Sequence, residues 1–282
     1  MNRIIFFLLA WLCTITLQAQ SIKILKGDSV VDSFTPEEAD RVIITESMSD
    51  YVEVGDLLWA TKNLGATSVA GSPSACYGDY YAWSEVAPRY TGMHITNSQQ
   101  ATFDGWAESH LYGYSANDCP SYSANAICAE NDAATQVWGN VGYEWRMPTA
   151  EEFHLLAQAC TGSMLSQTVT PLSTATPAGG IYWLESNQQL LSEYTGVAGV
   201  LFVLNDDTTK RIFFPAAGYV DGKEFGNGGV YGCYWTANRN TALPGDAFYM
   251  LLSSSNLNPS NSDPLYEGYS IRPVATKFQL VQ

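Results

Sequence analysis

The chain has 282 residues, with 28 acidic against 13 basic side chains and a formal net charge of −15 at pH 7. This excess of negative charge argues against nucleic acid and anionic membrane surfaces as partners, because both require positive patches on the protein. Charged residues make up only 15% of the chain and aromatic residues 13%, a balance that argues against a charged helical bundle and favours strands, aromatic packing and long loops.

The first 19 residues have the pattern of a secretory signal peptide. Arg3 provides a basic start, an apolar run from residue 4 to residue 12 follows, and residues 17–19 end in the small residue that cleavage requires. The apolar run is too short to cross a bilayer, and no later run approaches the roughly 20 apolar residues of a transmembrane helix. We therefore expect an exported chain without a membrane span, located in the periplasm, at the cell surface or outside the cell.

A small strand-rich segment is expected at residues 20–49. Residues 21–26 alternate between apolar and polar, a Gly-Asp turn signal follows, and Val30-Val31 begins a return strand, so this stretch predicts a hairpin. Residues 42–44 are a third strand candidate.

The main domain, residues 50–282, opens with a second predicted hairpin. Its strands are residues 51–54 and 57–63, joined by a Gly-Asp turn, and a further strand-like run covers residues 79–85.

A corner at residues 145–153 is predicted to define the fold. A short strand ends at Pro148, Thr149 is a suitable N-cap, and Glu152 lies where its carboxylate can reach back to the Thr149 backbone N–H. Every residue type here has a packing or capping role, so we expect structure rather than catalysis. The residues expected to define the fold are Trp145, Arg146, Pro148, Thr149, Glu152 and, near the end of the chain, Arg272.

The corner opens a helix with one apolar stripe, at Phe153, Leu156, Ala157 and Cys160. A shorter helix is expected at residues 133–138. The later strand candidates are residues 181–184, 200–204, 211–214, 234–236 and 247–252, with a closing segment at 269–274; residues 205–209 are a hairpin turn and residues 222–232 a glycine-rich loop.

Five cysteines follow the signal peptide, an odd number that cannot all pair within one chain. Cys119 and Cys128 flank a short polar segment and are the candidates for a local disulfide. Cys160 lies on the helix stripe, where a free thiol behaves as a small hydrophobe. The chain has no Cys-x-x-Cys motif, and its cysteine and histidine spacings do not match a zinc site.

Seven segments, in order, resemble an exported bacterial family, the Fibrobacter succinogenes major paralogous domain. They are residues 58–66, 77–85, 132–135, 145–149, 214–219, 232–236 and 271–274. The Trp-Arg-Met-Pro-Thr corner and the Arg-Pro-Val ending also resemble more distant relatives with the C-type lectin-like fold, including formylglycine-generating enzymes. The resemblance implies an α+β, C-type lectin-like domain with a twisted antiparallel sheet, two short helices, paired terminal strands and long loops that present a ligand face. The family carries no settled activity.

No catalytic constellation is visible in the sequence. The formylglycine-generating relatives need reactive cysteines, but nothing near Cys233 in the sequence supplies a cation to stabilise a thiolate. A divergent enzyme is kept as an alternative that would require a polar cleft near Cys233 or His154. No cofactor is predicted, although calcium is kept as an alternative. The side chains that could offer it oxygen ligands are Asn205-Asp206-Asp207 and Asn261, Asp263 and Glu267. The alternative is that these loops are simply solvated.

The remaining signal is aromatic. Residues 86–128 predict a long loop of the kind that is normally functional or mobile, and rings in such loops can stack against sugar or protein. The candidate ligand-binding residues are Trp106, Tyr112, Tyr114, Tyr122, Tyr231, Asn238 and Tyr266. We therefore expect a non-enzymatic binding or adhesion module of a bacterial cell envelope, contacting a glycan or a surface protein. The alternative is a structural cell-surface component assembled through its N-terminal strands.

Overall fold

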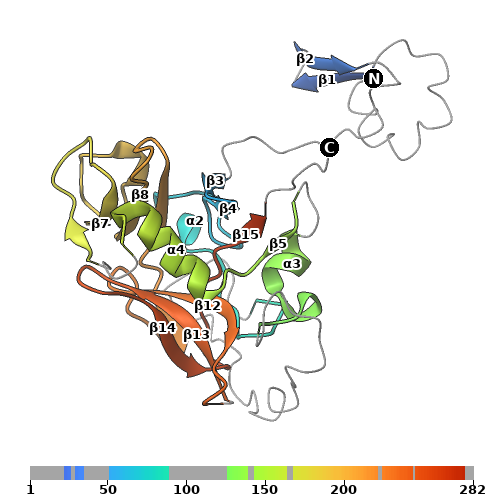
Figure 1. The fold of residues 1–282 in the computed structure, drawn as a ribbon, viewed down its shortest axis with the longest axis vertical. Coiled ribbons are helices and arrows are strands. Elements are labelled where there is room, and N and C mark those ends of the chain that lie inside the picture. Colours follow the sequence, from blue (N-terminus) through green and yellow to red (C-terminus); the bar gives the residue numbers. More distant parts are fainter. Residues whose placement is uncertain are drawn as a thin grey trace. The chain divides into compact units, whose positions relative to one another are not determined.

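The computed structural model describes the backbone of residues 22–26 and 29–34, and residues 51–88, 126–138, 143–163, 168–221, 224–243 and 245–276. The chain divides into two compact units, Met1–Thr45 and Glu46–Gln282. In the first unit, β1 (Ile22–Lys26) pairs antiparallel with β2 (Ser29–Phe34), so the first predicted hairpin is confirmed (Figure 1). The predicted signal peptide and the strand candidate at residues 42–44 lie outside the described residues.

The second unit is a mixed α+β domain that is rich in strands and poor in helix. One four-stranded sheet has the strand order β3-β4-β15-β5, so it brings strands from the start of this unit together with β15 from the far end of its described part. The strands are β3 (Tyr51–Val54), β4 (Leu57–Ala60), β15 (Val274–Thr276) and β5 (Trp145–Arg146). All three pairings are antiparallel, so the opening hairpin is confirmed and the first strands of this unit pair with its last.

A second four-stranded sheet, β6-β7-β8-β9, contains the most buried strand of the domain. Its members are β6 (Thr170–Pro171), β7 (Gly180–Leu184), β8 (Gly199–Val203) and β9 (Arg211–Pro215). β6 pairs with β7 in parallel and the other neighbours are antiparallel. Every residue of β8 is buried, in agreement with its continuous apolar run. These three longer strands and the hairpin turn between β8 and β9 were all predicted.

A third sheet, β12-β13-β14, forms the long hairpins drawn in orange in Figure 1. The strands are β12 (Gly232–Arg239), β13 (Asp246–Leu252) and β14 (Leu257–Pro264), and a separate pair is formed by β10 (Tyr219–Asp221) and β11 (Glu224–Gly226). The resemblance implies one twisted antiparallel sheet, whereas three larger sheets share the core within the described residues. The strand-like run at residues 79–85 is reduced to a bridge between Tyr81 and Tyr269.

Two predicted helices are confirmed, α3 (Ala133–Trp138) and α4 (Ala150–Thr161), and a single turn, α2 (Pro73–Cys76), is added. Short 3₁₀ helices follow at η4 (Ala129–Asn131) and η5 (Ser192–Tyr194). None of the helices in the described part of the chain combines the length and apolar character needed to cross a bilayer.

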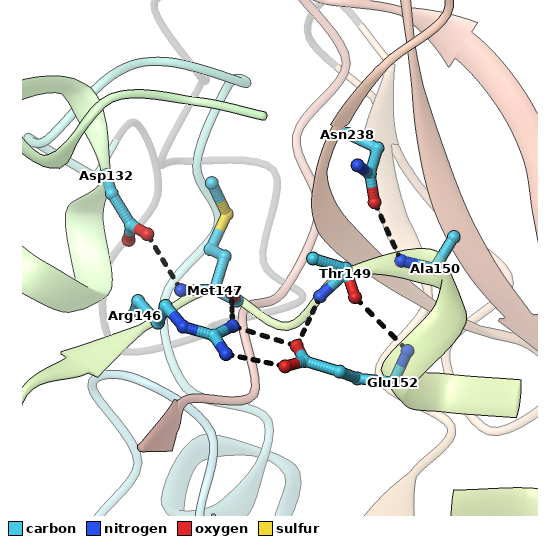
Figure 2. Close-up of polar contacts among 7 residues, drawn as sticks. All are labelled: Asp132, Arg146, Met147, Thr149, Ala150, Glu152 and Asn238. Atoms are coloured by element: carbon cyan, nitrogen blue, oxygen red, sulfur yellow. Dashed lines mark hydrogen bonds and ion pairs between the residues drawn. The ribbon is translucent and has the colours of Figure 1, made fainter. Parts of the chain in front are cut away.

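The corner before α4 has the predicted capping box. The Thr149 hydroxyl accepts from the Glu152 backbone N–H at 3.2 Å, and the Glu152 carboxylate accepts from the Thr149 N–H at 2.8 Å (Figure 2). The same carboxylate receives both terminal nitrogens of Arg146, at 2.8 and 2.5 Å. Asp132 of the preceding segment accepts from the Met147 N–H, so the corner is tied to α3 as well. Each of the seven residues drawn in Figure 2 takes part in at least one of the hydrogen bonds or ion pairs shown there.

The apolar stripe of α4 enters the main core as predicted. Phe153, Leu156, Ala157 and Cys160 are all buried, and Cys160 is a free thiol. Their neighbours are aromatic, including Trp59, whose ring centroid lies 5.1 Å from that of Phe153. This packing fixes α4 against β7, β12, β13 and β14, and so holds the third sheet in place.

Arg272 joins the ends of the domain from inside the core. It is 1% exposed, and its guanidinium donates to Asn63 Oδ1 and to the carbonyl oxygens of Ala60, Thr61 and Phe213 at 2.6–3.0 Å. Its charge also lies over the Phe214 ring, 4.4 Å from the centroid. Burial lowers the pKa of Arg272 to about 10, so the side chain stays protonated at neutral pH.

Candidate binding pocket

A pocket of about 560 Å³ opens beside the third sheet, within the size range of small-molecule sites. Alternate residues of β13, Tyr249 and Leu251, stand opposite Trp235 and Cys233 of β12. All but Trp235 line the pocket. The remaining lining residues come from β10, the turn after β11, the β13–β14 turn, the end of β14 and the segment that follows it: Tyr219, Asp221, Asn227, Tyr231, Ser253, Ser255, Asn256, Asp263, Glu267 and Tyr269.

Four tyrosines give the pocket aromatic walls. Tyr269 is central: its ring centroid lies 4.8 Å from that of Tyr249 and 6.3 Å from that of Tyr219. The Tyr269 ring packs on the ring of Trp235, with 4.3 Å between the two centroids. Trp235 is buried and donates its Nε1–H to the Tyr81 carbonyl oxygen. Tyr231 is 37% exposed at the rim. The aromatic walls are therefore packed on the buried Trp235 at their base and are open to solvent at the Tyr231 edge.

A carboxyl pair forms one side of the pocket. Val220 and Gly268 exchange backbone hydrogen bonds of 2.9 and 2.8 Å in an antiparallel bridge. The next residues, Asp221 and Glu267, therefore stand directly opposite each other at a pair without mutual backbone bonds, where side chains lie closest. Like charges in this position repel.

Glu267 lies deeper than its polar character would suggest. It is 9% exposed, and its Oε2 has no hydrogen-bond partner. Burial raises its pKa to about 8, and the nearby Asp221 and Asp263 carboxyls add to this effect through their charges and through a hydrogen bond that the protonated Glu267 donates to Asp221. The folded protein therefore keeps a proton on this group near neutral pH.

Asp263 completes the acidic side of the pocket. Its Oδ2 accepts a hydrogen bond of 2.5 Å from the Tyr269 hydroxyl. Burial raises the pKa of Tyr269 and of Tyr249, and the Asp263 carboxyl adds to both shifts, so both phenols stay neutral. Hydroxyl and amide groups of Ser253, Asn256 and Asn227 lie around the same space.

Cys233 lines the pocket but lacks the features of a reactive thiol. It is free and 3% exposed, and burial raises its pKa, with the Asp263 and Glu267 charges adding to the shift. Reactive cysteines have the opposite shift, because the thiolate is the nucleophile. The polar cleft that a divergent enzyme would require is present beside Cys233, but the thiol chemistry that the resemblance implies is not favoured there.

The sequence-predicted ligand residues fall in different places. Tyr231 lines the pocket. Tyr266 packs half-buried against an adjacent part of the core, and the Asn238 Oδ1 accepts from the Ala150 N–H at the start of α4 (Figure 2). Trp106, Tyr112, Tyr114 and Tyr122 lie outside the described residues. Cys128 is disulfide-bonded, while Cys119 also lies outside the described residues, so their pairing stays a prediction.

The two acidic stretches considered for calcium have other contacts. Asp207 accepts from the backbone and hydroxyl of Thr209, which closes the β8–β9 turn. Asn261 accepts from Asn258, and Asp263 from Tyr269. Within the described ranges, no group of three or more His, Cys, Asp or Glu side chains is arranged to hold a metal ion.

The sequence analysis did not identify Tyr219, Asp221, Tyr249 or Tyr269 as site residues. Tyr249 lies in a predicted strand, where an aromatic residue is equally suited to the core. Asp221 meets Glu267 only through the bridge at Val220 and Gly268, and no local pattern signals such a pairing. Comparison of the chain with protein-family models, with curated proteins and with solved structures finds no match.

The fold and the pocket together define a class: a strand-rich α+β domain that carries an open pocket with aromatic and acidic lining beside one of its sheets.

Proposed function

We propose that the chain is an exported, non-enzymatic binding module of a bacterial cell envelope, which holds a glycan in the pocket beside β12 and β13. The proposal includes a C-type lectin-like fold for residues 50–282, supported by the seven ordered segments that resemble the major paralogous domain family. It also includes removal of residues 1–19 on export, supported by the pattern of the signal sequence.

The observation that carries the proposal is the combination of groups in the pocket. The partly exposed rings of Tyr219 and Tyr231 offer flat apolar faces for the C–H face of a sugar, and the largely buried rings of Tyr249 and Tyr269 line the base of the pocket. Carboxyl, amide and hydroxyl groups from Asp221, Asp263, Asn227, Asn256 and Ser253 can accept and donate the hydrogen bonds of sugar hydroxyls. A few placed polar groups on aromatic walls are typical of sites for small polar ligands.

A second candidate function is a structural role through the N-terminal strands. Within the described residues of the first unit, β1 and β2 form a two-stranded sheet, and an exposed strand edge can accept a partner strand. Deleting residues 21–46 separates the two functions. Loss of envelope assembly with glycan binding intact supports the structural role, while unchanged assembly argues against it.

The glycan proposal is tested by screening the mature chain against an oligosaccharide array and measuring the hits by calorimetry. A Tyr231→Ala variant should lose about 1 kcal/mol of binding free energy, roughly a fivefold loss of affinity, because a rim ring that stacks on the sugar is removed. Val230→Ala is the matched control, since Val230 is the exposed neighbour of Tyr231 and does not line the pocket. An array without hits at high protein concentration, or equal losses in both variants, contradicts the proposal.

A further inference from the structure

Two of the aromatic rings that line the pocket are open to a ligand. Tyr219 is partly exposed and Tyr231 is 37% exposed, whereas Tyr249 and Tyr269 are only 8% and 3% exposed. A sugar that stacks on an aromatic face therefore meets the rings of Tyr219 and Tyr231 first. The placement of these two rings decides how a sugar can lie in the pocket.

The turn at residues 227–231 joins the backbones of the two ring residues. The Tyr231 N–H donates to the Asn227 carbonyl oxygen at 3.0 Å. The Tyr231 carbonyl oxygen in turn accepts from the N–H of Gly218, the residue before Tyr219, at 2.7 Å. Tyr219 and Tyr231 therefore belong to one hydrogen-bonded unit of backbone, although β11 separates them in the chain.

Three contacts set the orientation of the Tyr219 ring. The ring lies across Gly226, its partner in the β10–β11 pair, where an added β-carbon would come within 3.1 Å of it. Tyr269 meets it edge to face, with 6.3 Å between the centroids and 78° between the ring planes. Asn227 Nδ2 donates to the Tyr219 hydroxyl at 3.1 Å. Of the three contacts, only the one from Asn227 is a directed hydrogen bond, so it selects one position of the hydroxyl end.

The backbone of Asn227 suits this position. Its φ is +56°, in the left-handed region that asparagine and aspartate adopt more readily than other residues with a side chain. In this conformation the Asn227 carbonyl oxygen receives the N–H groups of both Val230 and Tyr231, each at 3.0 Å. One residue therefore holds the backbone of Tyr231 and the hydroxyl of Tyr219 at the same time.

We propose that Asn227 is a positioning residue of the pocket, which holds Tyr219 and Tyr231 as a preformed pair for a stacked sugar. The inference rests on the proposed glycan-binding function and specifies how the same pocket receives its ligand. A preformed pair reduces the cost of ordering side chains on binding. Without the Asn227 amide, the ligand itself must order the Tyr219 ring, and affinity falls.

Two substitutions at Asn227 separate the role of its side chain from that of its backbone. Asn227→Gly keeps the positive φ without strain and removes the amide. Asn227→Asp also tolerates this conformation, and its carboxylate can accept a hydrogen bond from the Tyr219 hydroxyl, so the link is kept with its direction reversed. Asn187→Gly is the matched control, because Asn187 is an exposed asparagine in a turn and does not line the pocket.

The first test is calorimetry of the mature chain with three β-1,4-linked tetramers, those of glucose, mannose and N-acetylglucosamine. For the tightest binder, Asn227→Gly should weaken binding by about threefold to tenfold, whereas Asn227→Asp and Asn187→Gly should stay within about twofold of the wild type. Combined with Tyr219→Phe, Asn227→Gly should cause no loss beyond that of Tyr219→Phe alone, because both remove the same contact. Additive losses, or an unchanged affinity in Asn227→Gly, overturn the positioning role.

A second readout needs no ligand. Carbon relaxation of the isotope-labelled Tyr219 ring, assigned by its loss in Tyr219→Phe, should show an ordered ring in the wild type and in Asn227→Asp and a mobile ring in Asn227→Gly. A role of Asn227 in the fold alone would change the free energy of unfolding, but it would leave the order of the ring and the coupling to Tyr219 in affinity unchanged.

The outcomes distinguish this inference from the function on which it rests. An ordered Tyr219 ring in Asn227→Gly, or a mobile ring without a loss of affinity, overturns the positioning role and leaves glycan binding standing. If none of the tetramers binds and the array has no hits, the glycan proposal is contradicted. The relaxation of the ring then decides by itself whether Asn227 holds Tyr219 in place.

Discussion

The corner before α4 and the pocket beside β12 both concentrate charged side chains, but they treat them in opposite ways. At the corner, the Glu152 carboxylate receives two nitrogens of Arg146 and one backbone N–H. In the pocket, Glu267 faces another carboxyl and leaves one oxygen without a partner.

This difference distinguishes polar groups that stabilise the fold from polar groups that are left for a ligand. A buried polar group whose hydrogen bonds are all made fixes one arrangement of the chain, whereas one without a partner can gain that partner from a ligand. The corner should therefore be sensitive to substitutions in stability, and the pocket in binding.

The largest effect on stability is expected at Arg272. Arg272→Met removes a buried guanidinium and leaves Asn63 Oδ1 and three carbonyl oxygens short of donors, which should lower the free energy of unfolding by about 3–5 kcal/mol. Urea denaturation measures it. Arg211→Met is the control, since it removes a long pair with the half-exposed Glu193, at 3.7 Å, and one exposed hydrogen bond to the Thr208 carbonyl oxygen, and a loss of about 1 kcal/mol or less is expected. Equal effects of the two substitutions would contradict the structural role of Arg272.

A smaller effect, dependent on pH, is expected at Glu267. Because its folded pKa is raised from 4.5 to about 8, the folded state holds the proton more tightly than the unfolded state. Stability from this group is thus complete below about pH 4.5 and is lost as pH rises towards 8. Relative to Glu267→Gln, the wild type should lose about 2 kcal/mol of unfolding free energy over this range, a value reduced for the open side of the pocket.

Asp207→Asn provides the control of opposite sign. Hydrogen bonds from Thr209 lower the pKa of Asp207, so its contribution is present above the usual aspartate range and is lost as pH falls. Urea denaturation between pH 3 and 9 should show the two differences running in opposite directions. A Glu267→Gln difference that does not vary with pH would mean that the pocket does not hold a proton on this group.

The smallest effect is expected at the capping box. Thr149→Ala removes the acceptor for the Glu152 N–H and should lower the free energy of unfolding by about 1 kcal/mol. Thr174→Ala, at an exposed turn, should change it by no more than a few tenths. Binding of oligosaccharides should be the same in both variants, and a loss of binding in Thr149→Ala alone would undo the separation between corner and pocket.

Local patterns were enough to predict much of the fold. The capping box, the stripe of α4, the buried run of β8 and the two hairpins each have a signal within a few neighbouring residues. β14 was not predicted, because Leu257–Pro264 is mostly Asn, Ser, Pro and Asp and becomes a strand only by pairing with β13. β11 was hidden in a glycine-rich segment for the same reason.

The pocket could be predicted only in fragments. Asp263 and Glu267 were singled out as acidic residues in a loop, and Tyr231 as an exposed ring, but nothing in the sequence joined them. They meet because β10 returns to the segment after β14 through the Val220–Gly268 bridge, and because Tyr269 packs on Trp235. Contacts between residues so distant in the chain depend on the assembled sheets rather than on local preference.

The most direct test of the contrast between corner and pocket is to measure Glu267→Gln in two assays on the same preparation: unfolding in urea at pH 8 and calorimetric titration with an oligosaccharide that binds the mature chain on the array. We predict an unfolding free energy equal to or above that of the wild type, together with a loss of affinity for the oligosaccharide. A less stable variant that binds the oligosaccharide as tightly as the wild type would contradict the account, because Glu267 would then serve the fold and not a ligand.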